Sequence, residues 1–200
     1  MDSLSAAHDY IYQNAALINA TVYTQDNYNF SLELSNGTTY DAIIKSQDNI
    51  TWYNSLLFNI SFGSLTAFLQ RIVGNYRIAS LLGIGPVLRG YQIIDNKVLI
   101  LIVDHLSYTV NYDILRDNYS AINMWLEKIH NVGIYHGNLN SGNLRMNKNN
   151  ELLMVNFDTM FYRDEKDLPI IIEWANHSVT QSIDQFIAQE AQVTFMRINN

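Results

Sequence analysis

The sequence lacks cysteine entirely, which excludes disulfide bonds and thiolate metal sites. Basic residues are scarce: 12 Lys and Arg stand against 19 Asp and Glu, the net charge is −7, and no basic residue precedes Lys45. Because so little positive charge gives no electrostatic footprint for DNA or RNA, we expect no nucleic-acid partner. No run approaches 18 apolar residues, and the N-terminus has no basic and apolar leader. We therefore expect no membrane partner and a cytoplasmic location.

The residues that are present suit a folded protein. Of the 200 residues, 48% are apolar and 16% are charged, which is enough material for a buried core. This length fits one domain, or two small lobes that share a core, better than a multidomain assembly. Asparagine is unusually common, with 24 residues, as expected where a genome favours AT-rich codons. Such a composition permits, without identifying, a viral or parasitic origin.

The first half of the chain has the pattern of a helix followed by antiparallel strands. Its predicted elements are a helix at 3–18, strands at 20–24, 29–35 and 38–46, a helix at 65–82, and strands at 90–94 and 97–103. Asn36-Gly37 predicts a tight hairpin turn between two alternating runs, and Asp95-Asn96 predicts a second turn. Gly83 marks the end of the long helix.

The second half of the chain has a mainly helical pattern. An amphipathic helix is predicted at 118–131, a short apolar strand at 152–155 and a helical region at 168–191. The apolar face of the first helix consists of Ile122, Trp125, Leu126 and Ile129, and the core candidates of the last region are Ile171, Trp174, Ile183, Phe186 and Ile187. The predicted fold class is therefore α+β.

The stretch from residue 133 to residue 160 holds the most specific pattern. It reads GIYHGNLNSGNLRMNKNNELLMVNFDTM, and it contains His136-Gly137-Asn138, Asn143 and Asn156-Phe157-Asp158 in that order. The spacing resembles the catalytic loop of protein and aminoglycoside kinases. Those enzymes carry His-Arg/Gly-Asp, an Asn five residues after the Asp, and a strand leading into Asp-Phe-Gly or Asp-Phe-Asp.

The resemblance extends upstream of this loop. Ala42-Ile43-Ile44-Lys45 resembles the kinase strand that carries the phosphate-binding Lys, residues 82–86 resemble the helix-to-strand junction, and residues 103–107 stand where a hinge belongs. Only 42 residues follow Asp158. The chain is therefore similar in size to small atypical kinases, namely the Rio family and the kinase of the tRNA threonylcarbamoylation complex, whose acidic stretch resembles residues 163–175.

The resemblance implies a bilobal protein kinase-like fold. A β-rich N-lobe would cover residues 1–103, and a truncated, mainly helical C-lobe would cover residues 104–200. Within this fold, a degenerate nucleotide site for ATP would include Lys45, Asn143, Asn156 and Asp158, of which Asn143 and Asp158 would be the candidate magnesium ligands. His136, Asn138 and Asn143 would form a degenerate catalytic loop, with His136 as a bracing residue.

Several departures from the kinase pattern remove the groups that phosphoryl transfer uses. Asn138 stands where a kinase loop Asp accepts the substrate proton, and Asn156 stands where an Asp holds magnesium. An amide is neutral at any accessible pH and is a poorer ligand than a carboxylate for a hard dication. In addition, no acid occurs in the helix that should pair with Lys45, and residues 1–35 contain no glycine for a phosphate loop. We therefore expect no functional catalytic residue, no firmly bound cofactor, and at most weak binding of ATP and magnesium.

Three functional hypotheses remain open. The first is a pseudokinase that acts by protein–protein interaction, for example on a host kinase or a kinase substrate. The second is a residual atypical phosphotransferase or ATPase in which Asp158 and Asn143 hold the metal. The third is an unrelated α+β interaction module. Two residues also keep simpler interpretations, because Lys45 could be a surface lysine and Asp158 could cap the turn that follows it. The sequence specifies neither the partner nor the oligomeric state.

Overall fold

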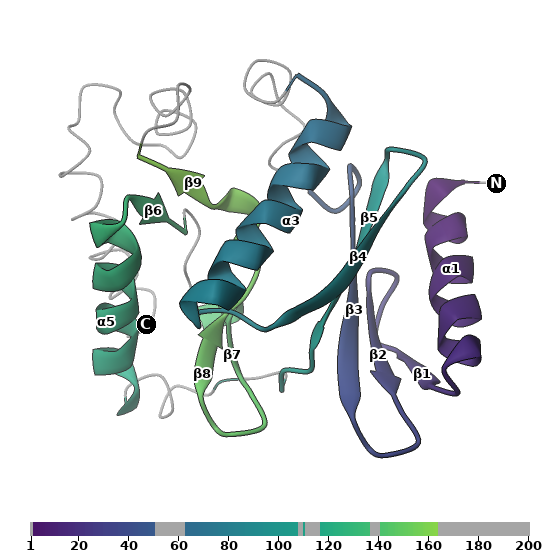
Figure 1. Ribbon diagram of the computed structural model, residues 1–200, viewed down its shortest axis with the longest axis horizontal. Helices are drawn as coiled ribbons and strands as arrows, with labels where there is room; N and C mark the ends of the chain where they lie inside the picture. Colours follow the sequence, from purple (N-terminus) through teal and green to yellow (C-terminus); the bar gives the residue numbers. More distant parts are fainter. Residues whose placement is uncertain (1, 51–62, 108–109, 111–116, 137–140, 164–200) are drawn as a thin grey trace. The chain divides into compact units, whose positions relative to one another are not determined.

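The computed structural model describes residues 2–50, 63–107, 110, 117–136 and 141–163 (Figure 1). The chain divides into two compact units, Met1–Leu106 and Ser107–Asn200, so that the division falls three residues after the predicted lobe boundary. Within the described ranges the protein is α+β, as predicted, with helices and antiparallel sheets. None of the helices in these ranges is long and apolar enough to cross a membrane.

A five-stranded antiparallel sheet with the order β1-β2-β3-β5-β4 lies at the centre of the first unit (Figure 1). Its strands are β1 (Thr21–Thr24), β2 (Asn29–Glu33), β3 (Thr39–Ser46), β4 (Leu88–Ile94) and β5 (Val98–Asp104). Both predicted hairpins are confirmed. Gly37 has φ +80°, and Asp95 and Asn96 have φ values of 51° and 57°, so each turn uses residue types that tolerate positive φ. Strand β4 begins two residues earlier than predicted, because the ladder continues through an irregularity between Leu88 and Gly90.

Helix α1 (Ser3–Leu17) packs on one face of this sheet, at the right of Figure 1. Asp2 caps its first turn, where the carboxylate accepts a hydrogen bond from the Leu4 amide at 2.7 Å. Ala7, Ile11 and Ala15 are buried and follow a spacing of four residues, which places them on one side of the helix. They form a core with alternate sheet residues, namely Phe30, Leu32, Ala42, Ile44, Val98 and Ile100.

Helix α3 (Leu65–Leu82) contacts β4 and β5 and confirms the second predicted helix. It begins at Ser64, whose hydroxyl accepts a hydrogen bond from the Ala67 amide at 3.2 Å. It ends at Gly83, which adopts the left-handed conformation with φ +68°. Its buried face includes Phe68, Leu69, Ile72 and Tyr76, while Leu99, Leu101 and Val103 are the buried residues of β5 that point away from the α1 core.

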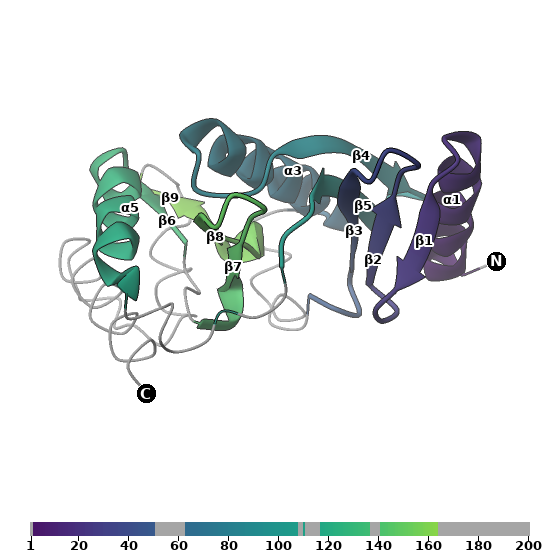
Figure 2. The ribbon, with the colours of Figure 1, turned by 90° about the horizontal axis from the view of Figure 1, so that it is seen from below.

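The second unit contains helix α5 (Tyr119–Asn131) and two small antiparallel sheets (Figures 1 and 2). Ile122, Leu126 and Ile129 are buried as predicted, whereas Trp125 is half-buried. In the sheets, β6 (Ile134–Tyr135) pairs with β9 (Phe161–Tyr162), and β7 (Leu144–Met146) pairs with β8 (Leu152–Met154). Of these strands only β8 was predicted. The helical region predicted at 168–191, with its core candidates, lies outside the described residues.

Candidate functional site

His136 follows β6 and holds two segments of the kinase-like motif together. Its side chain is buried, and its Nε2 atom lies 3.0 Å from the carbonyl oxygen of Val155, just after β8. The imidazole also contacts the ring of Phe157, with a centroid separation of 5.3 Å and an interplanar angle of 59°. These contacts connect the residue after β6 to the segment after β8.

The structure brings Asn143 and Asn156 together. Asn143 ends the short 3-10 helix η2 (Ser141–Asn143), and its carbonyl oxygen accepts a hydrogen bond from the Val155 amide at 2.9 Å. The side-chain amide of Asn156 donates to Oδ1 of Asn143 at 3.4 Å. Two residues that lie 13 positions apart in the sequence are thus in side-chain contact, and we call them the asparagine pair.

Asn156 adopts an unusual backbone conformation for a residue other than glycine. Its φ and ψ are 64° and 57°, in the left-handed region, which asparagine tolerates better than most side chains. The conformation turns the chain from β8 into the 3-10 helix η3 (Phe157–Thr159). In that helix Phe157 is fully buried and Asp158 is 4% exposed. A buried carboxylate therefore lies within two residues of the asparagine pair.

The other predicted site residues belong to different parts of the chain. Lys45 lies in the first unit, where it is half-buried on β3 and opposite Leu99 in the register with β5. Helix α3 contains no Asp or Glu, so it offers no carboxylate to Lys45. Asn138 lies outside the described residues, as does nearly all of the acidic stretch at 163–175.

The turn between β1 and β2 is built around Asp26, a residue outside the predicted site. Its Oδ1 atom accepts hydrogen bonds from the backbone amides of Tyr28 at 2.7 Å and Asn29 at 2.8 Å. Both carboxylate oxygens also contact the Asn29 side-chain amide, at 3.0 and 2.9 Å. Two backbone amides of this turn thus already donate to a negative charge, which disfavours a phosphate group there.

A second carboxylate, Asp41 on β3, fixes the segment predicted as a hinge. Its Oδ1 atom lies 2.7 Å from His105 Nδ1 and accepts a hydrogen bond from the Ser31 hydroxyl at 3.0 Å. Its Oδ2 atom accepts a hydrogen bond from the backbone amide of Leu106 at 3.1 Å. No local pattern in the sequence predicts this network, because its members lie up to 75 positions apart, by count from Ser31 to Leu106.

The magnesium ion that the resemblance implies does not fit the described donors well. The Oδ1 atom of Asn143 already accepts a hydrogen bond from Asn156, and both side chains are neutral. Magnesium prefers carboxylates and phosphate oxygens, and Asp158 is the acid nearest in sequence to the pair. In the part of the chain that the structure describes, no group of three or more His, Asp or Glu side chains is arranged to hold a metal ion.

No protein-family model matches the chain, and a comparison with curated proteins finds no matching relative. The kinase resemblance therefore rests on the sequence motif alone.

Proposed function

We propose that the protein is a pseudokinase, a kinase-like fold that does not transfer phosphate and acts by binding another protein. The observation that carries the proposal is the contact between Asn156 and Asn143. A kinase would use a carboxylate at the first of these positions to hold magnesium against the nucleotide. Here one neutral amide donates a hydrogen bond to another, and Asn138 is neutral as well.

The order of the elements supports a kinase-like fold. Strand β3, which carries Lys45, precedes the long helix α3, and the hairpin β4–β5 leads into the predicted hinge at 103–107. Helix α5 then precedes His136, and the hairpin β7–β8 leads into Asn156-Phe157-Asp158. This is the order in which the resemblance requires the phosphate-binding strand, the hinge and the loop motifs.

Two features of the first unit are expected to weaken nucleotide binding. In the turn that precedes the Lys45 hairpin, the backbone amides of Tyr28 and Asn29 already donate to the Asp26 carboxylate. At the predicted hinge, the Leu106 amide already donates to Asp41, so it is less available to a nucleobase.

The partner of such a protein would be a kinase or a kinase substrate, and the composition suits a viral or parasitic protein that acts on host signalling in the cytoplasm.

A residual phosphotransferase is the second candidate, and the position of Asp158 favours it. This carboxylate is 4% exposed and follows Asn156 by two residues, so it could take over a metal site in a shifted geometry. The two candidates differ in whether ATP is turned over and in whether Asp158 is needed for turnover.

We expect no ATP turnover from the wild-type protein, and little from the double variant Asn138→Asp with Asn156→Asp. Loss of a general base or of a positioning group typically costs about 10²- to 10⁴-fold each. Restoring two carboxylates leaves the phosphate loop and the helix acid still missing. ATP turnover is measured as the release of labelled phosphate from ATP, with and without magnesium. Asn149 is exposed, and Asn149→Asp is the matched control for added negative charge.

Magnesium-dependent turnover by the wild-type protein that is lost in Asp158→Ala would contradict the pseudokinase proposal and support the second candidate. Strong turnover in the double variant alone would contradict the expectation that the rest of the site is incomplete.

A further inference from the structure

Asn36 and Gly37 form the tip of the hairpin between β2 and β3. Of the 24 asparagines in the sequence, Asn36 is the one that precedes a glycine. Both residues are exposed, and a Cβ atom built on Gly37 would meet no atom of the described residues within 4 Å. Solvent therefore reaches the peptide bond that joins the two residues, and the glycine brings no side chain that would hinder a reaction at its nitrogen.

A hydrogen bond folds the side chain of Asn36 back over the next peptide unit. Its Oδ1 atom accepts a hydrogen bond from the Thr38 amide at 2.9 Å, which makes an Asx turn. The ring that this bond closes runs through Gly37, so the side-chain carboxamide of Asn36 lies beside the Gly37 backbone. The bond also draws electron density from the side-chain carbonyl group, which makes the Cγ atom more reactive toward a nucleophile.

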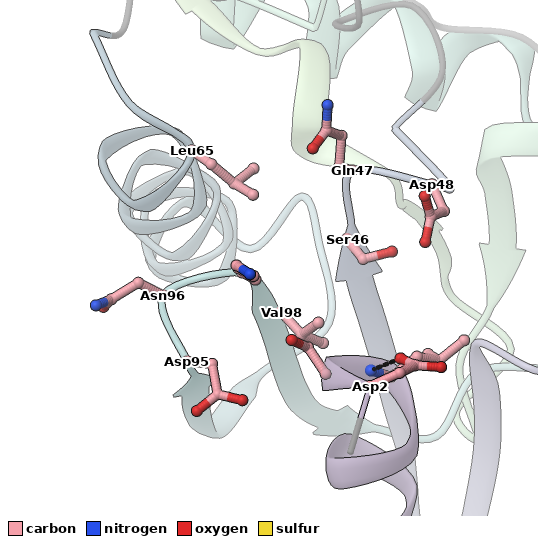
Figure 3. Close-up of a pocket in the computed structure, with 11 residues that line it drawn as sticks. Asp2, Ser46, Gln47, Asp48, Leu65, Asp95, Asn96 and Val98 are labelled. Atoms are coloured by element: carbon pink, nitrogen blue, oxygen red, sulfur yellow. Dashed lines mark hydrogen bonds between the residues drawn. The ribbon is translucent and has the colours of Figure 1, made fainter.

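Two other asparagines each share one of these features, but both precede a lysine. Asn96 lies at the exposed tip of the β4–β5 hairpin, beside a cavity (Figure 3). Asn147 makes the same Asx contact, since its Oδ1 atom accepts a hydrogen bond from the Asn149 amide at 2.8 Å. In both cases the side chain of the following lysine crowds the approach to the lysine nitrogen. These two residues are therefore internal controls for Asn36.

We propose that Asn36 is a site of spontaneous deamidation, a covalent modification that consumes only water. The Gly37 nitrogen, after it loses its proton to solvent, attacks Cγ of Asn36. The N–Cγ bond forms, the Cγ–Nδ2 bond breaks, and Nδ2 leaves as ammonia with a proton returned by solvent, so that a cyclic succinimide remains. Water then opens the succinimide at Cγ to give an ordinary aspartate, or at the backbone carbonyl carbon to give isoaspartate. In either case one water molecule is consumed and one ammonia molecule is released.

The Gly37 nitrogen must release one hydrogen bond before it reacts. In the folded hairpin the Gly37 amide donates to the Leu34 carbonyl oxygen at 2.9 Å. Exposed loop tips open locally at a small cost in free energy, so the folded protein reacts through brief openings of this turn. The reaction is therefore slower in the folded protein than in the unfolded chain, where nothing holds this amide.

The two products differ in their effect on the hairpin. An ordinary aspartate at position 36 keeps an oxygen acceptor for the Thr38 amide and adds a negative charge at an exposed tip, so the hairpin persists. Isoaspartate adds a methylene group to the main chain between Leu34 and Thr38. The Leu34 amide donates to the Thr38 carbonyl oxygen at 2.9 Å, and this hydrogen bond should be lost in the isoaspartate form.

The test is incubation of the full-length folded protein at neutral pH and physiological temperature, followed by peptide mapping with mass spectrometry. Each conversion replaces an amino group by a hydroxyl group, and fragmentation that cleaves the Cα–Cβ bond distinguishes isoaspartate from aspartate. Asn36 is expected to convert at least about tenfold faster than Asn96 and Asn147, which corresponds to about 1.4 kcal/mol of activation free energy. Both products are expected at position 36, and the Leu34 amide should exchange faster in the isoaspartate form.

Variants separate the effect of the glycine from that of the turn. Gly37→Ala should slow the conversion of Asn36 by a similar factor, and Lys148→Gly should accelerate the conversion of Asn147. Because alanine is strained at the φ of +80° that Gly37 adopts, Asn36→Gln is the second variant, and it should form no acidic product at position 36. Equal rates at Asn36 and Asn147 would overturn the proposal, as would a folded protein that is unchanged after the urea-unfolded chain has converted completely.

Discussion

Replacing Phe157 with alanine is expected to lower the free energy of unfolding of the second unit by about 3–5 kcal/mol. The Phe157 side chain is fully buried, and its ring packs against the imidazole of His136. Truncation would leave a cavity beside the asparagine pair and would remove the support for His136. Urea unfolding monitored by NMR signals from the second unit measures the loss.

Met124→Ala is the matched control for this substitution. Met124 lies on α5 in the same unit, but it is 65% exposed, and alanine is a good helix former. We expect a change within about 0.5 kcal/mol, as is usual for surface substitutions. An equal free energy of unfolding for the two variants would contradict the burial of Phe157 in the core of the second unit.

Asp41→Ala is expected to lower the free energy of unfolding of the first unit by about 3 kcal/mol. Hydrogen bonds to a charged group contribute about 1.5–3 kcal/mol, and in this variant partly buried donors would lose their acceptor. The variant removes the acceptor of the Ser31 hydroxyl and the Leu106 amide and the partner of His105. Hydrogen exchange of the Leu106 amide should also accelerate, since this amide would no longer be held by Asp41.

Two variants separate the network from a simple loss of negative charge. Asp41→Asn keeps one acceptor oxygen and should lose less stability than Asp41→Ala. Asp9→Ala removes an exposed carboxylate from α1 and should change the free energy of unfolding by less than about 0.5 kcal/mol. An Asp41→Ala variant as stable as Asp9→Ala would contradict the role of Asp41 in fixing the segment after β5.

Local signals in the sequence were sufficient to predict most of the first unit. The period of α1 and α3, the Gly83 cap, and the Asn36-Gly37 and Asp95-Asn96 turns each depend on residues that are close in the chain. The strands β6, β7 and β9 were missed because runs of two or three residues carry no measurable alternation. They form only because tertiary contacts bring their partners together.

The candidate site was predictable in part. The kinase resemblance implied that His136, Asn143 and Asn156 belong to one site. In the structure His136 contacts Val155 and Phe157, and Asn143 contacts Val155 and Asn156. The carboxylates of Asp26 and Asp41, which accept hydrogen bonds from backbone amides, were not predicted as part of the site. For Asp26 a local signal exists, since an Asp between two strands can form an Asx turn by accepting the backbone amide two residues later. For Asp41 none exists, because its partners come from β2 and from the residues after β5.

Loss of nucleotide binding is central to the pseudokinase proposal, and a thermal unfolding titration with ATP tests this loss most directly. A ligand that binds only the folded state at 100 times its dissociation constant stabilises a protein by about 2.7 kcal/mol, which is readily seen as a rise in melting temperature. We predict little or no rise with ATP, either with or without magnesium. A magnesium-dependent rise that grows with ATP concentration and disappears in both Lys45→Ala and Asp158→Ala would contradict the account.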